Sequence, residues 1–485
     1  MISVFIIIFF LLGPAKSLVF KCQTKPITAS ASDEGVIPTN ATVPTNVTAG
    51  TDCFIHFEVP RGYALRFETR VKGNNGSDIF ELVDPLGKTH DQDLTLVYED
   101  VWFTEGKGLL KIASPKGAMS FIVKYYYKQL SDFFNNTIPT GTVLPVELRY
   151  FTTYKFFSPT NDRIAISVAP KNPTNVIGKH IFVYDGENIA NATMIGTLAD
   201  LMKGKDRVYS KGAVMHLVDF YGLDEPKGVI VVNDASTVAN LTSYSVVLVV
   251  DGTVNKTILP GGACTFISVK SNFLNLRNMT IATKTGKAQL QGQLPNHRLK
   301  KVIEYTNDLD TRFPQTIPTK VITVYAINAN VSLSVAPENK LNQTLIDNQK
   351  GVVVSQNLWG DVKNSGDYGW IKLVSDKKTQ FYNFTIEFDK IEFNDSKTSI
   401  SVKIDDQYQR FSMANKPTGS FSGVGTSCNI SIENAVNTTD IRLSYSAQKT
   451  TFIPTTSEPI QSTTKSGNVA SIFVSFSIAL ILFFN

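Results

Sequence analysis

The chain has 485 residues, of which 42% are hydrophobic and only 18% are charged, below the roughly 25% usual for soluble domains. Its 47 basic and 42 acidic residues leave a formal charge of +5, which excludes a nucleic-acid binder argued from charge alone. Four cysteines exclude a disulfide-dense scaffold, and five histidines leave little material for metal or acid–base chemistry. At roughly 100–200 residues per domain, the length predicts three or four domains.

The first 17 residues, MISVFIIIFFLLGPAKS, predict a secretory signal peptide. The apolar run over residues 2–12 is too short to span a bilayer, and Ala15 and Ser17 stand at the −3 and −1 positions of a cleavage site. A buried core helix is the alternative, and it fits poorly at a chain terminus. We therefore expect an exported chain that begins at Leu18.

Most of the chain alternates apolar and polar residues with a period of two, as in residues 55–59, 164–168 and 384–388. This alternation is typical of half-buried β-strands. Helical periodicity is scarce, and residues 195–202 are the best short candidate. Because turn residues separate many short strands, we predict an all-β protein built from β-sandwiches.

A longer period divides the chain into four units. Each unit has an anchor residue, a short apolar strand, a polar turn and a second apolar strand. The anchors are 101, 110 and 106 residues apart, and they are Cys53, Tyr154, Cys264 and Trp370. We predict domains at 18–127, 128–251, 252–336 and 337–448, the third being the most divergent.

Short runs in several units resemble a known family. The second unit has VYDG at 183–186, IGTL at 195–198 and SKG at 210–212, similar to the Y-D-G, I-G-x-L and S-x-G runs of CUB domains. In the fourth unit, GVVVS at 351–355 and WI at 370–371 resemble the opening G-x-I-x-S and the C-x-W-x-I of CUB modules, without the cysteine. Residues 22–127 look like the divergent nematode CUB-like domain, and the whole chain resembles the nematode CUB-like surface proteins.

This resemblance implies tandem antiparallel, jelly-roll-like β-sandwich modules. It also implies a non-enzymatic extracellular protein, in a group often linked to innate defence against microbes. The resemblance further implies a disulfide between Cys22 and Cys53, equivalent to the first disulfide of CUB domains. Four cysteines allow three connectivities; we expect the remaining Cys264 and Cys428 to form an inter-module bridge, with unpaired or intermolecular thiols as the open alternative.

The sequence holds 14 Asn-x-Ser/Thr sequons, each of which needs a surface position in a secreted protein to be used. This density predicts a glycoprotein, although we expect some sites to be unused; Asn383 lies inside a strand-like run. The sequon asparagines are Asn40, Asn46, Asn75, Asn135, Asn191, Asn240, Asn255, Asn278, Asn330, Asn342, Asn383, Asn394, Asn429 and Asn437.

The C-terminal residues predict a lipid anchor. Residues 449–466 are rich in Ser, Thr and Pro, which is typical of a stalk. The apolar run at 469–484 has 16 residues, short of the roughly 20 that a spanning helix needs, and no basic residue follows it. Small residues before a hydrophobic C-terminal tail indicate a GPI-attachment signal. We therefore expect attachment at Ser466, with Ser462 as the close alternative, and removal of residues 467–485. A tail-anchored or single-span protein is the competing interpretation.

Catalytic motifs are absent from the sequence: it has no H-E-x-x-H, C-x-x-C, G-x-S-x-G or Walker-type loop. We therefore predict no enzyme, no catalytic residue, no resident metal and no cofactor. His216 shares a strand face with Val214 and Val218, which favours a core histidine over a ligand. Three consecutive tyrosines, Tyr125, Tyr126 and Tyr127, must place alternate rings outward. An outward ring either anchors an interface or lies on the solvent-exposed side of an edge strand.

Calcium is a weaker hypothesis, because some CUB modules bind it with acidic side chains at one end of the sandwich. Asp185, Asp219 and the pair Asp405-Asp406 stand near matching places. The alternative for Asp185 is a turn in which the carboxylate bonds its own backbone.

Together these features predict a GPI-anchored glycoprotein on the outer leaflet of the plasma membrane. We expect recognition or adhesion in innate defence, through an extracellular protein or glycan ligand and not through nucleic acid. A structural coat component without a specific ligand is the alternative hypothesis, and an enzyme is the third.

Overall fold

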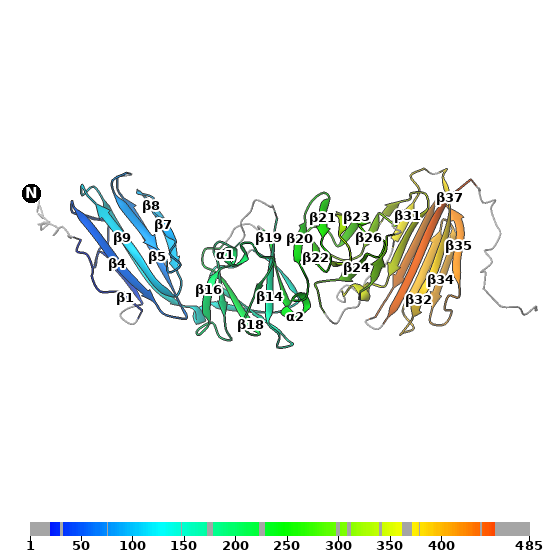
Figure 1. Cartoon of the computed structure of the whole chain (residues 1–485), viewed down its shortest axis with the longest axis horizontal. Helices are drawn as coiled ribbons and strands as arrows, with labels where there is room; N and C mark the ends of the chain where they lie inside the picture. Colours follow the sequence, from blue (N-terminus) through cyan, green and yellow to red (C-terminus); the bar gives the residue numbers. More distant parts are fainter. Residues whose placement is uncertain are drawn as a thin grey trace, which may run out of the picture. The chain divides into compact units, whose positions relative to one another are not determined.

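The computed structural model describes residues 20–29, 33–74, 76–146, 148–171, 178–222, 228–296, 301–307, 312–338, 342–360, 371–377, 379–436 and 439–451. Within these ranges the chain consists largely of β-strands, which confirms the predicted all-β class (Figure 1). The strands form eight sheets, and the chain divides into two compact units, Met1–Asn240 and Leu241–Asn485.

The first β-sandwich opens the unit Met1–Asn240. Its sheets have the strand orders β1-β4-β9-β6-β7 and β2-β10-β5-β8, and β3 also pairs with β10. The strands are β1 (Ile27–Thr28), β2 (Glu34–Ile37), β3 (Thr45–Asn46), β4 (Thr51–Val59), β5 (Tyr63–Lys72), β6 (Ile79–Val83), β7 (Thr89–Asp91), β8 (Thr95–Phe103), β9 (Gly106–Ser114) and β10 (Ser120–Gln129). Inward-facing residues of both sheets, among them Phe57, Phe67 and Phe121, meet in one core, as the period-two pattern predicts.

The second sandwich completes this unit, with sheets β11-β13-β18-β15-β16 and β12-β19-β14-β17. Its elements are η1 (Leu130–Asp132), β11 (Phe134–Pro139), β12 (Thr142–Pro145), β13 (Thr152–Phe157), β14 (Ile164–Pro170), β15 (Ile181–Asp185), β16 (Thr193–Thr197), α1 (Leu198–Met202), β17 (Val208–Tyr209), β18 (Val214–Asp219), β19 (Gly228–Asp234), α2 (Ala235–Val238). A cluster that includes Ala64, Trp102, Phe182 and Phe220 buries the junction of the two sandwiches. Helix α1 lies within the stretch predicted as helical.

The third sandwich begins the unit Leu241–Asn485, with sheets β20-β22-β27-β24-β25 and β21-β28-β23-β26. Its strands are β20 (Tyr244–Val249), β21 (Val254–Ile258), β22 (Ala263–Ser268), β23 (Phe273–Ile281), β24 (Lys287–Gly292), β25 (Ile303–Tyr305), β26 (Gln315–Ile317), β27 (Val321–Ile327) and β28 (Val331–Glu338).

The fourth sandwich has sheets β29-β31-β36-β33-β34 and β30-β37-β32-β35. Its elements are β29 (Asn342–Thr344), β30 (Gln349–Val354), η2 (Gln356–Trp359), β31 (Ile371–Val374), β32 (Phe381–Glu392), β33 (Ser399–Ile404), β34 (Gln407–Ser412), β35 (Ser420–Gly425), β36 (Ser427–Glu433) and β37 (Asp440–Thr450). Trp359 of η2 packs into the core of the third sandwich, which joins the two within their unit.

One topology recurs in all four sandwiches. In each five-stranded sheet the first strand pairs in parallel with the second, as β1 does with β4, while the remaining ladders are antiparallel. The sandwiches are thus antiparallel, as expected, except for one parallel ladder in each. The anchors Cys53, Tyr154 and Cys264 lie on the equivalent strands β4, β13 and β22. Trp370 lies outside the described residues, immediately before β31.

The predicted boundary at 251 is displaced in the structure. Strand β20 pairs in parallel with β22, so residues 244–249 belong to the third sandwich and not to the end of the second. The apolar run at 244–250 resembles a closing strand in sequence, but pairing is decided by the partner strand. Strands β10 and β28 likewise run past the predicted limits at 127 and 336.

Candidate recognition surface

The three consecutive tyrosines of β10 alternate between core and surface. Tyr127 is buried, and its hydroxyl donates to the carbonyl oxygen of Ile27 at 2.8 Å. Tyr125 packs edge-on against Phe57, with ring centroids 5.9 Å apart. Tyr126 faces outward, so the predicted alternation of the rings is confirmed.

Tyr126 belongs to a polar face that crosses three neighbouring strands. The ladders place it opposite Arg66 of β5, and they place Glu68 opposite Asp100 and Arg70 opposite Tyr98 of β8. We call the surface formed by Arg66, Glu68, Tyr98, Asp100 and Tyr126 the Tyr126 face. All five side chains lie on one side of the sheet because a strand turns alternate residues to the same side.

Hydrogen bonds and ion pairs join this face into one network. One guanidinium nitrogen of Arg66 lies 2.8 Å from an oxygen of Asp100, and the other lies 3.1 Å from an oxygen of Glu68. The Tyr126 hydroxyl donates to the second oxygen of Glu68 at 3.3 Å. The side chains are therefore held in place before any partner arrives, which reduces the entropy lost on binding.

The charges of the face also perturb one another. Burial works against the charge of Arg66, but the hydrogen bond and charge of Asp100 outweigh it and raise the Arg66 pKa. Burial raises the pKa of Tyr98 and of Tyr126, and the nearby Glu68 carboxylate adds to both shifts. Both phenols therefore stay protonated at neutral pH and keep a hydrogen-bond donor.

One end of the face is anchored by the second sandwich. Trp102 of β8 stacks on Phe220, with centroids 5.0 Å apart and planes 14° apart, and Arg66 lies 6.0 Å from the centre of its ring. The backbone N–H of Trp102 donates to the Tyr221 hydroxyl at 3.1 Å. The outer strand β8 is thus fixed at this end, whereas Tyr98 further along it is 50% exposed.

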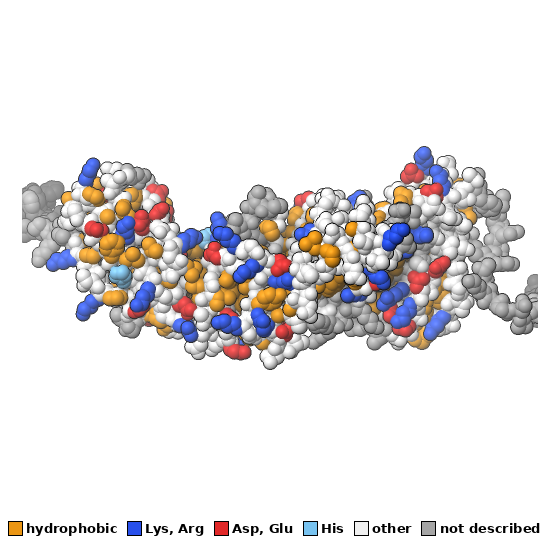
Figure 2. All heavy atoms as spheres, in the orientation of Figure 1, with side chains coloured by type: hydrophobic (Ala, Val, Ile, Leu, Met, Phe, Trp, Pro, Cys, Tyr) orange, Lys and Arg blue, Asp and Glu red, His pale blue; other side chains and the backbone are white. Residues whose placement is uncertain are grey.

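This arrangement suits protein recognition. Tyrosine and arginine are enriched among the residues that carry most of the energy of protein–protein interfaces. On the visible face of the molecule, Lys and Arg are interspersed with Asp and Glu over the described residues (Figure 2), in line with the low net charge. Sequence reasoning found Tyr126 but missed Arg66, Glu68 and Asp100, because their pairing depends on the register of β5 and β8.

The carboxylates considered for calcium bond to backbone groups instead. Asp185 accepts from the Lys211 N–H at 3.0 Å, and Asp219 accepts from the Tyr221 N–H at 2.9 Å. Asp405 accepts from the N–H groups of residues 426 and 427, each at 2.8 Å, and Asp406 is exposed. Among the described residues, no three metal-ligating side chains come together.

His216 is a core residue, as its strand face predicts. It is 2% exposed, and its Nε2–H donates to the carbonyl oxygen of Gly186 at 3.0 Å. Burial lowers its pKa to about 4, and the charge of Lys155 contributes.

The cysteines divide into one bridge and two buried thiols. Cys22 and Cys53 are bonded, with Cα atoms 5.6 Å apart, which confirms the pairing that the resemblance implied. The expected Cys264–Cys428 bridge is wrong, because Cys264 lies in the core of the third sandwich and Cys428 in the core of the fourth. Burial raises the pKa of Cys264 to about 12, so this thiol is unreactive.

Ten of the 14 sequon asparagines have exposed side chains, including Asn383 on β32, and Asn429 is half-buried. The side chains of Asn75, Asn342 and Asn437 lie outside the described residues. So do the predicted signal peptide, nearly all of the stalk, and the attachment candidates Ser462 and Ser466. In the part of the chain that is described, no helix is both long and apolar enough to cross a membrane.

Comparison with known proteins supports a CUB-like assignment of the first sandwich. The family model of the CUB-like domain matches residues 18–131. No curated protein sequence matches the chain.

Several solved structures share weak similarity with the chain. One is the CUB1-EGF-CUB2 domain of human MASP-1/3, with 10% sequence identity and a TM-score of 0.16; the match covers 41% of this chain and 93% of that one. The CUB1-EGF-CUB2 domains of rat MASP-1 have 10% identity and a TM-score of 0.16, and the match covers 41% of this chain and 99% of that one. The full extracellular region of zebrafish Gpr126/Adgrg6 has 8% sequence identity and a TM-score of 0.21, and the match covers 89% of this chain and 53% of that one.

Proposed function

We propose that the chain is a non-enzymatic extracellular recognition protein, and that the Tyr126 face is its docking surface for a protein partner. The observation that carries this proposal is the pre-formed network of Arg66, Glu68 and Asp100 beside Tyr98 and Tyr126. It lies within the segment that matches the CUB-like family model. CUB-like domains are generally non-catalytic binding modules of extracellular proteins.

Finer features of this proposal come from the sequence. The recurring strand order supports four tandem CUB-like modules, and ten exposed sequon asparagines support a glycoprotein. The terminal segments favour a signal peptide and GPI attachment at Ser466. The resemblance to nematode CUB-like surface proteins favours a role in innate defence at the cell surface, where several weakly binding modules on one anchor gain avidity.

A coat component without a specific ligand is the second candidate, and the exposed sequons favour it. An array that carries host extracellular proteins and bacterial surface polysaccharides separates the two. Recognition predicts reproducible, selective binding of the recombinant protein to a protein spot; a coat component predicts none. Phosphatidylinositol-specific phospholipase C should release the protein from intact cells, and retention on the membrane would remove the lipid anchor from the proposal.

A further inference from the structure

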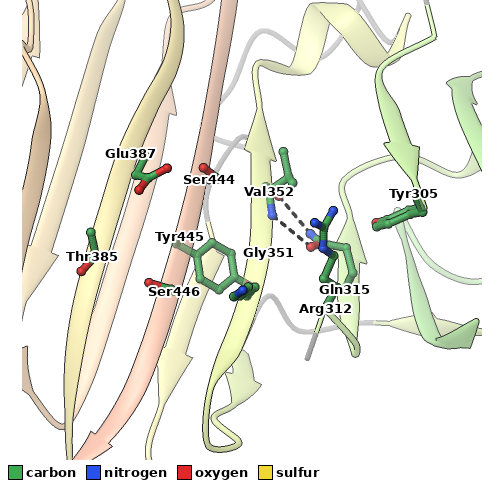
Figure 3. Close-up of a pocket in the computed structure, with 11 residues that line it drawn as sticks. Tyr305, Arg312, Gln315, Gly351, Val352, Thr385, Glu387, Ser444, Tyr445 and Ser446 are labelled. Carbon is green, nitrogen blue, oxygen red and sulfur yellow. Dashed lines mark hydrogen bonds between the residues drawn. The ribbon is translucent and has the colours of Figure 1, made fainter. Parts of the chain in front are cut away.

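A polar cavity opens within the unit Leu241–Asn485, where the third and fourth sandwiches meet (Figure 3). Its volume is about 280 Å³, just below the roughly 300–1,000 Å³ typical of small-molecule sites. Strands β30, β37 and β32 supply one wall, and residues of the third sandwich supply the other. A site of this size suits a ligand with a single ring.

The backbone around the cavity is held firmly. The side-chain amide of Gln315 spans Val352 of β30, accepting from its N–H at 3.1 Å and donating to its carbonyl oxygen at 3.0 Å. The neighbouring Gly351 pairs with Tyr445, and a Cβ on Gly351 would overlap the Tyr445 ring, which packs in the core of the fourth sandwich. Lys350 and Val352, on either side of Gly351, therefore point to the opposite side of β30, toward the cavity.

Two opposite charges line the cavity without neutralising each other. Lys350 of β30 and Glu387 of β32 are exposed, and neither has an ion-pair partner among the described residues. Strand β37 separates them, because Lys350 pairs with Ser446 and Glu387 with Ser444. Strands two apart lie roughly 10 Å from each other, a distance within the span of one ligand that contacts both side chains.

The remaining lining is rich in hydroxyl groups. Thr385, Ser444 and Ser446 contribute them from the sheet, and the Arg312 guanidinium adds a second positive charge. The Tyr305 hydroxyl points toward the cavity in Figure 3, is buried, and has no hydrogen-bond partner among the described residues. A buried hydroxyl without a partner costs free energy, and a polar ligand that reaches it would recover part of that cost.

The geometry points to a binding site for one acidic sugar of the uronic-acid class. Arg312 and Lys350 would bind its carboxylate, because a guanidinium and an ammonium are the side chains suited to that group. Glu387 and the hydroxyls of Ser446 and Thr385 would bind the ring hydroxyls. This site is independent of the Tyr126 face, which lies in the other unit.

Calorimetric titration of the full mature protein with glucuronate, methyl glucuronide and glucose tests this inference. We expect glucuronate to bind with at least tenfold higher affinity than glucose. Binding of methyl glucuronide at the same strength indicates the end of a glycan as the natural ligand, and binding of free glucuronate alone indicates a soluble sugar acid. Absence of glucuronate binding, or equal binding of glucose, overturns the inference.

Two variants locate the site. Arg312→Gln should weaken glucuronate at least tenfold, and Lys350→Gln provides the same test if the first variant fails to fold. Lys256→Gln is the matched control, a half-buried lysine on β21 that does not line the cavity, and it should bind as the unmodified protein does. Glucuronate binding that survives both cavity variants contradicts the inference.

Discussion

The sheet that carries the Tyr126 face and the sheet that lines the polar cavity are built alike but present different chemistry. Both have the same strand order, and both set a glycine of the first strand opposite a tyrosine of the second, Gly35 with Tyr125 and Gly351 with Tyr445. On the first sheet, opposite charges stand on the same strand or on adjacent strands and bond directly. On the second, ion pairs also form on β32 and β37, but the two charges that line the cavity, Lys350 and Glu387, stand two strands apart and have no ion-pair partner among the described residues. The spacing of charges across the ladder thus decides whether one backbone frame presents a closed network or an open site.

The disulfide gives the largest expected difference between the two units. The Cys22–Cys53 bridge joins residues 31 positions apart, which in the chain-entropy model stabilises the first sandwich by about 3–4 kcal/mol. We expect reduction to increase hydrogen exchange in β4 and β9. Unit Leu241–Asn485, whose two cysteines are unbonded, should be unchanged. Equal loss of protection in both units would contradict this contrast.

His216 makes the stability of unit Met1–Asn240 depend on pH. Its pKa is lowered from 6.5 to about 4, so between these values the unfolded chain holds a proton that the folded chain does not. The free energy of unfolding should therefore fall by about 3 kcal/mol as the pH drops from 6.5 to 4. His216→Gln should flatten this slope in chemical denaturation, whereas His56→Gln on the exposed side of β4 should retain it; equal slopes in both variants would refute the assignment.

The glycine opposite the tyrosine can be tested in the fourth sandwich. In Gly351→Ala, the new methyl group overlaps the Tyr445 ring in a packed core, so we expect a loss of about 1–3 kcal/mol. Gly212→Ala is the matched control, because nothing lies within 4 Å of the position of its Cβ. Thermal unfolding should separate the two variants, and equal midpoints would show that the ring moves aside.

The Arg66 network should have the smallest effect on stability. Arg66→Gln removes two ion pairs that are partly shielded from solvent, and we expect a loss of about 1 kcal/mol. Lys270→Gln breaks the exposed pair with Asp251 and should change the unfolding free energy by less than the measurement error. If both variants lose the same stability, the network of the Tyr126 face is not stronger than an ordinary surface pair.

The fold was accessible from the sequence because period-two alternation survives in nearly every strand. The recurring anchors Cys53, Tyr154 and Cys264 also fell on equivalent strands. The boundary at 251 was not accessible, since β20 differs from a closing strand only in its pairing partner.

The candidate sites depend on register and packing, which composition does not encode. Alternation placed Tyr126 outside, but the bond from Arg66 to Asp100 joins residues 34 positions apart on different strands. The expected Cys264–Cys428 bridge failed for the same reason, because each cysteine faces the core of its own sandwich.

Binding by variants of the Tyr126 face tests the central claim most directly. Tyr98→Ala combined with Tyr126→Ala should weaken binding to the protein partner found on the array at least tenfold, because truncated interface anchors cost about 1–2 kcal/mol or more each. Tyr408→Ala is the control, a tyrosine that is 58% exposed on β34 of the other unit, and it should bind normally. If the double variant folds and binds as tightly as the control, the Tyr126 face is not the recognition surface.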